Sequence, residues 1–179
     1  MNLAEFQALL DALLDEAGID LLEVRAHIAA KAVVESLDTT TGRVTDLALA
    51  HNNLFGINWV PDDGDRYHRV ILAGNKVDKE LGRASVSYRV YRSKTACVEN
   101  VLYQLYASDH RRAAWKACGY WLLSAHTRPS AARTFVAQAE ATWAADPEHV
   151  RTMLAEYDRQ LARMKKSAAP ATDNRAVIS

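Results

Sequence analysis

The chain has 179 residues, of which 49% are hydrophobic and 25% charged, and its 22 basic and 22 acidic side chains balance to a formal net charge of zero. This composition excludes a disordered or collagen-like chain, and the length predicts one compact domain, with or without a tail. Zero net charge argues against a general nucleic-acid or membrane-surface binder. We expect no membrane span, because no stretch approaches about 18 consecutive apolar residues. We also expect no secretory signal, because acidic residues stand where its basic region would be.

The first forty residues predict two helices and a loop. Apolar side chains recur every three or four positions over residues 3–14, and Gly18 ends that helix. A second helix is expected over residues 20–36, with Asp20 as its cap and an alanine-rich centre suited to close packing. A threonine-rich loop, residues 38–41, follows and is closed by Gly42.

The middle of the chain predicts two or three short antiparallel strands. Turn signals separate runs rich in valine, isoleucine and aromatic residues: INWV (57–60), YHRVIL (67–72) and SVSYRVY (85–91). The acidic turn PDDGD (61–65) suggests a calcium loop at first sight. It lacks the glutamate at position twelve of an EF-hand, so a solvated turn is the favoured interpretation.

The last third of the chain is expected to be helical from residue 94 to residue 164. Pro129 stands in the first turn of a helix over residues 128–143, and Asp146 followed by Pro147 is typical of another helix start. The residues after Met164 are small and polar. The sequence therefore predicts an α+β fold that is mainly α, with a single domain over residues 1–165 and a flexible tail over residues 166–179.

The sequence indicates no cofactor and no metal site. Cys97 and Cys118 have neither metal-pair nor redox-pair spacing, so we expect free buried thiols, with a structural disulfide as the less favoured alternative. The histidines form no HxxxH pair, and the chain has neither a phosphate-binding glycine loop nor a G-x-S-x-G elbow.

Glu35 and the NNLFG segment are the candidates for chemistry. Glu35 ends an apolar helix and faces a loop, where partial burial would raise the pKa of its carboxyl group and suit a general acid. The alternative is an ion pair with Lys31, one helical turn earlier. The amides of Asn52 and Asn53 can recognise a sugar N-acetyl group, or the segment can be a turn leading into a strand; Gly56 permits positive φ.

The order of these segments resembles the glucosaminidase family of peptidoglycan hydrolases, glycoside hydrolase family 73. The family pattern is an alanine-rich helix ending in E-S-G-x-G, a loop, L-A, and N-N-L-F-G-I-K; this chain has AAKAVVES, then LALAHNNLFGIN. Downstream, VDKELGRASVSYRVYRS is similar to the family's β-hairpin stretch, and TWAADPEHVRTMLAEY is similar to its closing helical segment. The likeness spans about residues 26–157 and implies a lysozyme-like helical body with a small β-hairpin lobe.

The resemblance assigns catalytic roles to acidic residues. Glu35 matches the family's catalytic glutamate, the proton donor to the glycosidic oxygen. Glu80 matches the acid of the hairpin, with Asp78 as the alternative, since strand residues two apart point the same way. A carboxylate there would activate water, or would stabilise the transition state while the substrate's N-acetyl group assists.

The same resemblance places Asn53 and Phe55 in the sugar site, with Tyr88 and Tyr91 on the strand after the hairpin. For both tyrosines a packing role is as well supported as a sugar-binding role. The chain departs from the family pattern at Leu37, which replaces a glycine, and at two tyrosine positions. There Trp143, which could stack on a sugar face, and His149 take the place of tyrosines.

These features imply a peptidoglycan hydrolase that cleaves the β-1,4 bond after N-acetylglucosamine, without a cofactor. The departures motivate an alternative: a catalytically weakened glycan-binding or structural component of a phage or secretion assembly. We expect glycan strands as the partner, and neither nucleic acid nor membrane insertion. Without a visible signal peptide, a bacteriolytic phage lysin fits best. Such a protein is made in the cytoplasm and acts in the periplasm or cell wall, as an endolysin released at lysis or as part of a virion.

Overall fold

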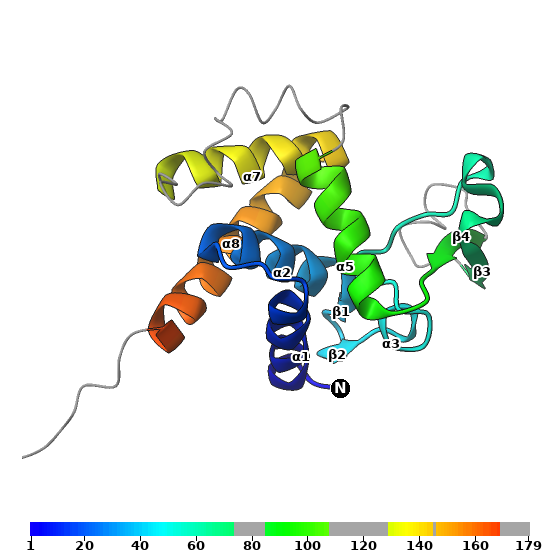
Figure 1. Ribbon diagram of the computed structural model, residues 1–179, viewed down its shortest axis with the longest axis horizontal. Helices are drawn as coiled ribbons and strands as arrows, with labels where there is room; N and C mark the ends of the chain where they lie inside the picture. The colour runs from blue at the N-terminus through cyan, green and yellow to red at the C-terminus, as the bar shows by residue number, and fades with distance from the viewer. Residues whose placement is uncertain (74–84, 108–128, 145, 169–179) are drawn as a thin grey trace, which may run out of the picture.

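The computed structural model describes residues 1–73, 85–107, 129–144 and 146–168 (Figure 1). These residues form a mainly helical body with two small antiparallel hairpins, which confirms the predicted α+β, mainly α class. In chain order the elements are α1 (Leu3–Glu16), α2 (Leu22–Ser36), β1 (Leu37–Asp38), β2 (Arg43–Val44), α3 (Asp46–Ala50), the 3-10 turn η1 (Pro61–Arg66), β3 (His68–Ala73), β4 (Ser85–Val90), α5 (Lys94–Leu102), the π-helical turn η2 (Tyr103–Ala107), α7 (Pro129–Trp143) and α8 (Pro147–Ala168).

The two N-terminal helices follow the predicted spans closely. At the start of α1, the Asn2 side chain accepts from the backbone N–H of Glu5, and the Glu5 carboxylate accepts from the backbone N–H of Asn2. Gly18, at φ +66°, reverses the chain after α1 as expected. The predicted cap of α2 was wrong, because Leu21 and not Asp20 occupies that position.

The core forms around α2, which packs most extensively against α8 and also contacts α1 and α7 (Figure 1). Its alanines are completely buried, and their small side chains let the neighbouring helices approach closely. Large apolar side chains from the surrounding helices complete one continuous core. They include Phe6, Leu10 and Leu14 of α1, Val98 and Val101 of α5, Phe135 and Val136 of α7, and Met153 and Tyr157 of α8.

The threonine-rich loop joins the two-residue strands β1 and β2, which pair through Leu37 with Val44 and through Asp38 with Arg43. The Asp38 carboxylate accepts from the backbone N–H groups of Thr40 and Thr41. These hydrogen bonds hold the pKa of Asp38 below its usual value. The loop that the sequence predicts is therefore the tip of a short hairpin.

A second hairpin stands at the side of the molecule away from α8 (Figure 1). Strands β3 and β4 pair from His68 with Val90 to Ala73 with Ser85, so two of the three predicted strands form as expected. The third predicted strand, residues 57–60, contributes only an isolated bridge from Asn58 to Tyr88.

The acidic turn between these segments is not simply a solvated turn. The carboxylate of Asp63 is buried and accepts two hydrogen bonds from the Arg89 guanidinium, at 2.7 and 2.8 Å. Burial opposes ionisation of Asp63, but the bonds from Arg89 outweigh it and hold the pKa of Asp63 below its usual value. The expectation of a solvated turn was therefore wrong at Asp63.

The C-terminal helices begin where the sequence predicts them. Pro129 opens α7, and the Asp146 carboxylate caps α8 by accepting from the backbone N–H of Glu148. Helix α8 continues to Ala168, three residues into the predicted tail, and residues 169–179 lie outside the described part.

Among the described residues no helix is long and apolar enough to cross a membrane. Cys97 is a free buried thiol as expected, whereas Cys118 lies outside the described residues.

Candidate functional site

Glu35 lies in the last turn of α2, where this helix meets the NNLFG segment. The next residue, Ser36, donates its hydroxyl to the carbonyl oxygen of Leu54 at 2.6 Å and so fixes the end of the helix against that segment. The Glu35 side chain is 24% exposed. A Cβ atom at Gly56 would lie 3.5 Å from Oε2 of Glu35, so the glycine backbone forms the wall facing the carboxyl group.

The NNLFG segment is a turn held by its own side chains. Asn52 and Gly56 both adopt positive φ, at 54° and 58°. The Asn53 amide donates to the carbonyl oxygens of Ile57 and Arg89 and accepts from the backbone N–H of Ile57, each at 2.9 Å. Asn53 therefore fixes the turn that carries Gly56 and links it to β4.

A group of ionisable side chains, most of them completely buried, lies behind Glu35. At its centre is Glu140 of α7, whose side chain is completely buried. One carboxylate oxygen is 2.8 Å from Nε2 of His27, and the other is 2.8 Å from Nζ of Lys31 and 3.3 Å from Nε2 of His149. We call His27, Lys31, Glu140 and His149 the Glu140 cluster.

The Glu140 cluster reaches Glu35 through two of its members. Oε1 of Glu35 lies 3.8 Å from Nζ of Lys31 and 3.9 Å from Nε2 of His149. The ion pair between Lys31 and Glu35 that the sequence offered as an alternative is thus present, but the contact of Lys31 with Glu140 is shorter. The Trp143 ring packs against one member of the cluster, with Lys31 Nζ 3.9 Å from the ring centroid.

The two glutamates are shifted in opposite directions. Burial raises the pKa of Glu35; nearby Lys31 and His149 act against this, and Glu140 adds to it. Burial also opposes ionisation of Glu140, but hydrogen bonds from His149 and His27, together with the charge of Lys31, hold its pKa far below the usual range. The arrangement therefore makes the partly exposed carboxyl group a weaker acid than usual and the buried one a stronger acid than usual.

The other predicted site residues lie in different surroundings. Asn53 and Phe55 are fully buried, one bonded to backbone and the other in the core, and Tyr88 lies on β4 opposite Val70. Glu80 and Asp78, the alternatives for the second acid, lie outside the described residues. Of the predicted set, Glu35 and Trp143 are brought together, since both contact Lys31.

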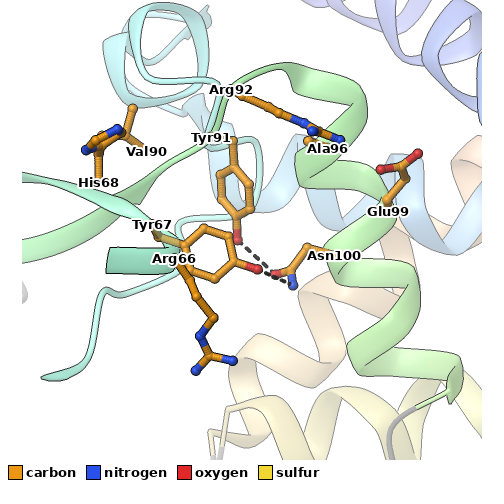
Figure 2. A pocket seen from close by; sticks show the side chains of 9 residues that line it. All are labelled: Arg66, Tyr67, His68, Val90, Tyr91, Arg92, Ala96, Glu99 and Asn100. Carbon is orange, nitrogen blue, oxygen red and sulfur yellow. Dashed lines mark hydrogen bonds between the residues drawn. The ribbon is translucent and has the colours of Figure 1, made fainter. Parts of the chain in front are cut away.

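Tyr91 lines a cavity of about 580 Å³ between the base of the β3–β4 hairpin and α5 (Figure 2). Its hydroxyl donates to Oδ1 of Asn100 at 2.9 Å, and the amide nitrogen of Asn100 donates to the Tyr67 hydroxyl at 3.1 Å. Figure 2 shows both tyrosine hydroxyls directed at this amide. Burial raises the pKa of Tyr91, so its hydroxyl stays protonated.

The sequence interpretation did not identify Glu140 or His27. Both carry a signal in retrospect, since each is a polar residue on an otherwise apolar helix face: Glu140 follows Val136 by four residues, and His27 lies in the alanine-rich centre of α2. A buried charge requires a partner, and here the cluster draws its members from three helices. Among the described residues, no group of three or more metal-ligating side chains is placed to hold an ion.

Comparison of the chain with protein-family models, with curated proteins and with solved structures found no match.

Proposed function

We propose that this protein is a peptidoglycan hydrolase that cleaves the β-1,4 bond after N-acetylglucosamine, with Glu35 as general acid. The observation that carries the proposal is the environment of Glu35. Its carboxyl group is partly exposed, faces the glycine of the NNLFG turn, and has a raised pKa because of burial. A general acid needs this combination of access to substrate and a retained proton.

The contacts of Glu35 also fit the second half of its role. When the carboxyl group gives its proton to the glycosidic oxygen, it becomes a carboxylate. The nitrogens of Lys31 and His149, at 3.8 and 3.9 Å, are then in place to stabilise that negative charge. The positive charge that develops on the sugar would be stabilised by the carboxylate of Glu80 or Asp78, or by the substrate's own N-acetyl group.

Digestion of purified peptidoglycan tests this proposal. We expect the wild-type protein to release fragments with N-acetylglucosamine at the reducing end, identified by mass spectrometry. Glu35→Gln keeps the shape of the side chain but has no acidic proton to give, so the rate should fall by about 10²–10⁴-fold. Glu16→Gln, which makes the same chemical change at an exposed position on α1, should retain full activity. Full activity of Glu35→Gln would show that the mechanism is wrong.

A second candidate is a glycan-binding component with weakened catalysis. The contacts of Lys31 and His149 with Glu35 favour it, because both side chains act against the raised pKa that a general acid needs. Sedimentation with insoluble peptidoglycan distinguishes the two candidates. Binding without release of reducing ends supports the second candidate, and reducing-end muramic acid instead of N-acetylglucosamine would indicate a muramidase.

A further inference from the structure

Glu140 is a carboxylate that nothing in the proposed reaction uses, yet it is completely buried in the helical body. Its two oxygens together lie within 3.3 Å of three nitrogens that come from α2 and α8. Taking a carboxylate out of water is unfavourable unless its partners are held in good geometry. Such a group is an unusual choice for filling a core, and its position next to Glu35 suggests a role in the site.

The distances show how Glu140 divides its partners. Lys31 Nζ is 2.8 Å from Glu140 and 3.8 Å from Glu35, and His149 Nε2 is 3.3 Å from Glu140 and 3.9 Å from Glu35. Both nitrogens are therefore held on the inner side, nearer to the buried carboxylate than to the exposed one. They still remain within 4 Å of Glu35, where a new negative charge would attract them.

We propose that Glu140 is a positioning residue for Glu35. It holds Lys31 and His149 beside the Glu35 carboxyl group, and its negative charge pairs with Lys31, which would otherwise pair with Glu35. This inference rests on the proposed function of Glu35 as a general acid. In the resting protein the ammonium group of Lys31 is neutralised by Glu140, so Glu35 can keep its proton. After proton transfer, the same nitrogens stabilise the Glu35 carboxylate without a large rearrangement.

The charged and titratable groups around Glu35 are few in the described part of the chain. Lys31 faces it from α2, His149 from α8 and Glu140 from α7, while the NNLFG turn presents the uncharged backbone of Gly56. The variants below change only side chains of this group and His27, so a change in the Glu35 titration between them and the wild type is assigned to Lys31, His149 and Glu140.

The test is a carboxyl carbon NMR titration of the full-length protein labelled at glutamate. In Glu140→Gln the shape of the side chain is kept, but Lys31 loses its negatively charged partner and interacts more strongly with the Glu35 carboxyl group. We expect the titration midpoint of Glu35 to move to lower pH than in the wild type. The alkaline limb of kcat/KM should move with it, so that a midpoint lowered by about one pH unit reduces activity on that side about tenfold.

His27→Gln is the matched control. It removes a partner from the other oxygen of Glu140, whereas the charges that act on the pKa of Glu35 are those of Lys31, His149 and Glu140. His27→Gln should therefore lower the free energy of unfolding while the titration midpoint of Glu35 stays at the wild-type pH. If Glu140→Gln does not fold, the pair Lys31→Met with Glu140→Gln removes both charges together, a change that buried pairs often tolerate. There the Glu35 midpoint should equal or exceed that of the wild type.

An unchanged Glu35 midpoint in folded Glu140→Gln would overturn the inference, as would a lowered midpoint in the double variant or in His27→Gln. The NMR readout does not depend on catalysis. Absence of hydrolysis by the wild-type protein, with the expected midpoint shifts present, would refute the proposed function and leave the electrostatic role of Glu140 standing.

Discussion

The side-chain amide of Asn53 accepts from the backbone N–H of Ile57 and donates to the carbonyl oxygens of Ile57 and Arg89. The Ile57 carbonyl also accepts from the backbone N–H of Arg89, so Asn53→Ala would deprive the Ile57 N–H and the Arg89 carbonyl of these hydrogen bonds. An unsatisfied buried polar group costs about 1–3 kcal/mol. We expect Asn53→Ala to lower the free energy of unfolding by about 3 kcal/mol, measured by urea denaturation. A variant with unchanged stability and reduced glycan binding would contradict this structural role and restore the role in the sugar site that the resemblance implies.

Gly56 combines a backbone requirement with a contact to the catalytic candidate. At φ +58° an alanine is strained, so Gly56→Ala should cost about 1–2 kcal/mol of stability. Its new methyl group would lie 3.5 Å from Oε2 of Glu35, displace solvent there and raise the pKa of Glu35 further. The pH profile of hydrolysis should then show its alkaline limb at higher pH.

Gly42→Ala is the control for this prediction. Gly42 has nearly the same φ, +65°, but apart from its chain neighbours no atom of the described residues lies within 4 Å of a Cβ built on it. The two variants should lose similar stability in urea denaturation, and the pH profile should move only for Gly56→Ala. A shift of equal size in both would show that the effect comes from the backbone and not from the contact with Glu35.

At the scale of elements, the pair Asp63–Arg89 ties η1 to strand β4. The side chains are 4% and 14% exposed, and breaking a buried pair by removing one partner costs about 3 kcal/mol or more. Asp63→Ala should therefore lower the free energy of unfolding by about 3 kcal/mol. Asp158→Ala breaks an ion pair with Arg133 in which both side chains are half exposed, and it should cost less than about 1 kcal/mol.

The packing of α2 depends on small side chains. Ala30 is completely buried, so Ala30→Leu would force neighbouring side chains out of place and cost about 1–3 kcal/mol in thermal or urea unfolding. A leucine there without loss of stability would mean that the helices around α2 can separate. In that case the close approach of Glu140 to Lys31 would not depend on alanine packing.

For the whole molecule, the two shifted glutamates predict how stability depends on pH. Glu140 stays ionised in the folded protein, whereas in the unfolded chain it takes up a proton near its usual value of 4.5. The contribution of Glu140 to the free energy of unfolding should thus be fully present above pH 4.5 and be lost as the pH falls below 4.5. Glu35 has the opposite sign, since the stability from its retained proton is present below 4.5 and is lost as the pH rises through its raised pKa.

Urea denaturation across a pH series measures this. The double variant Lys31→Met with Glu140→Gln removes the buried carboxylate, so its stability should fall less steeply than that of the wild type between pH 4.5 and lower values. Equal slopes would contradict the strongly lowered pKa of Glu140. Asp63, whose pKa is also lowered, contributes to the acid slope of both proteins and so cancels from the comparison.

Much of the architecture could be predicted from local signals. Periodic apolar residues located α1 and α2, and Pro129 and Asp146 marked the starts of α7 and α8. Local signals did not predict features that depend on contacts with residues distant in the sequence. Residues 57–60 have the composition of a strand but make one bridge to β4 and no ladder. The composition of the Asp63 turn predicts exposure to solvent, but in the structure Arg89, 26 residues later, binds the Asp63 carboxylate.

Local sequence was enough to establish a mainly helical chain with a small hairpin, and to place Glu35 at the end of an apolar helix where the chain enters a loop. Periodicity, caps and positive φ are properties of neighbouring residues, so they can be recognised without the fold. The electrostatics of Glu35, by contrast, depend on the folded arrangement. Glu140 lies 109 residues from Lys31 and 113 from His27 along the chain. The packing of α2, α7 and α8 brings these charges together away from water, where they act strongly on one another.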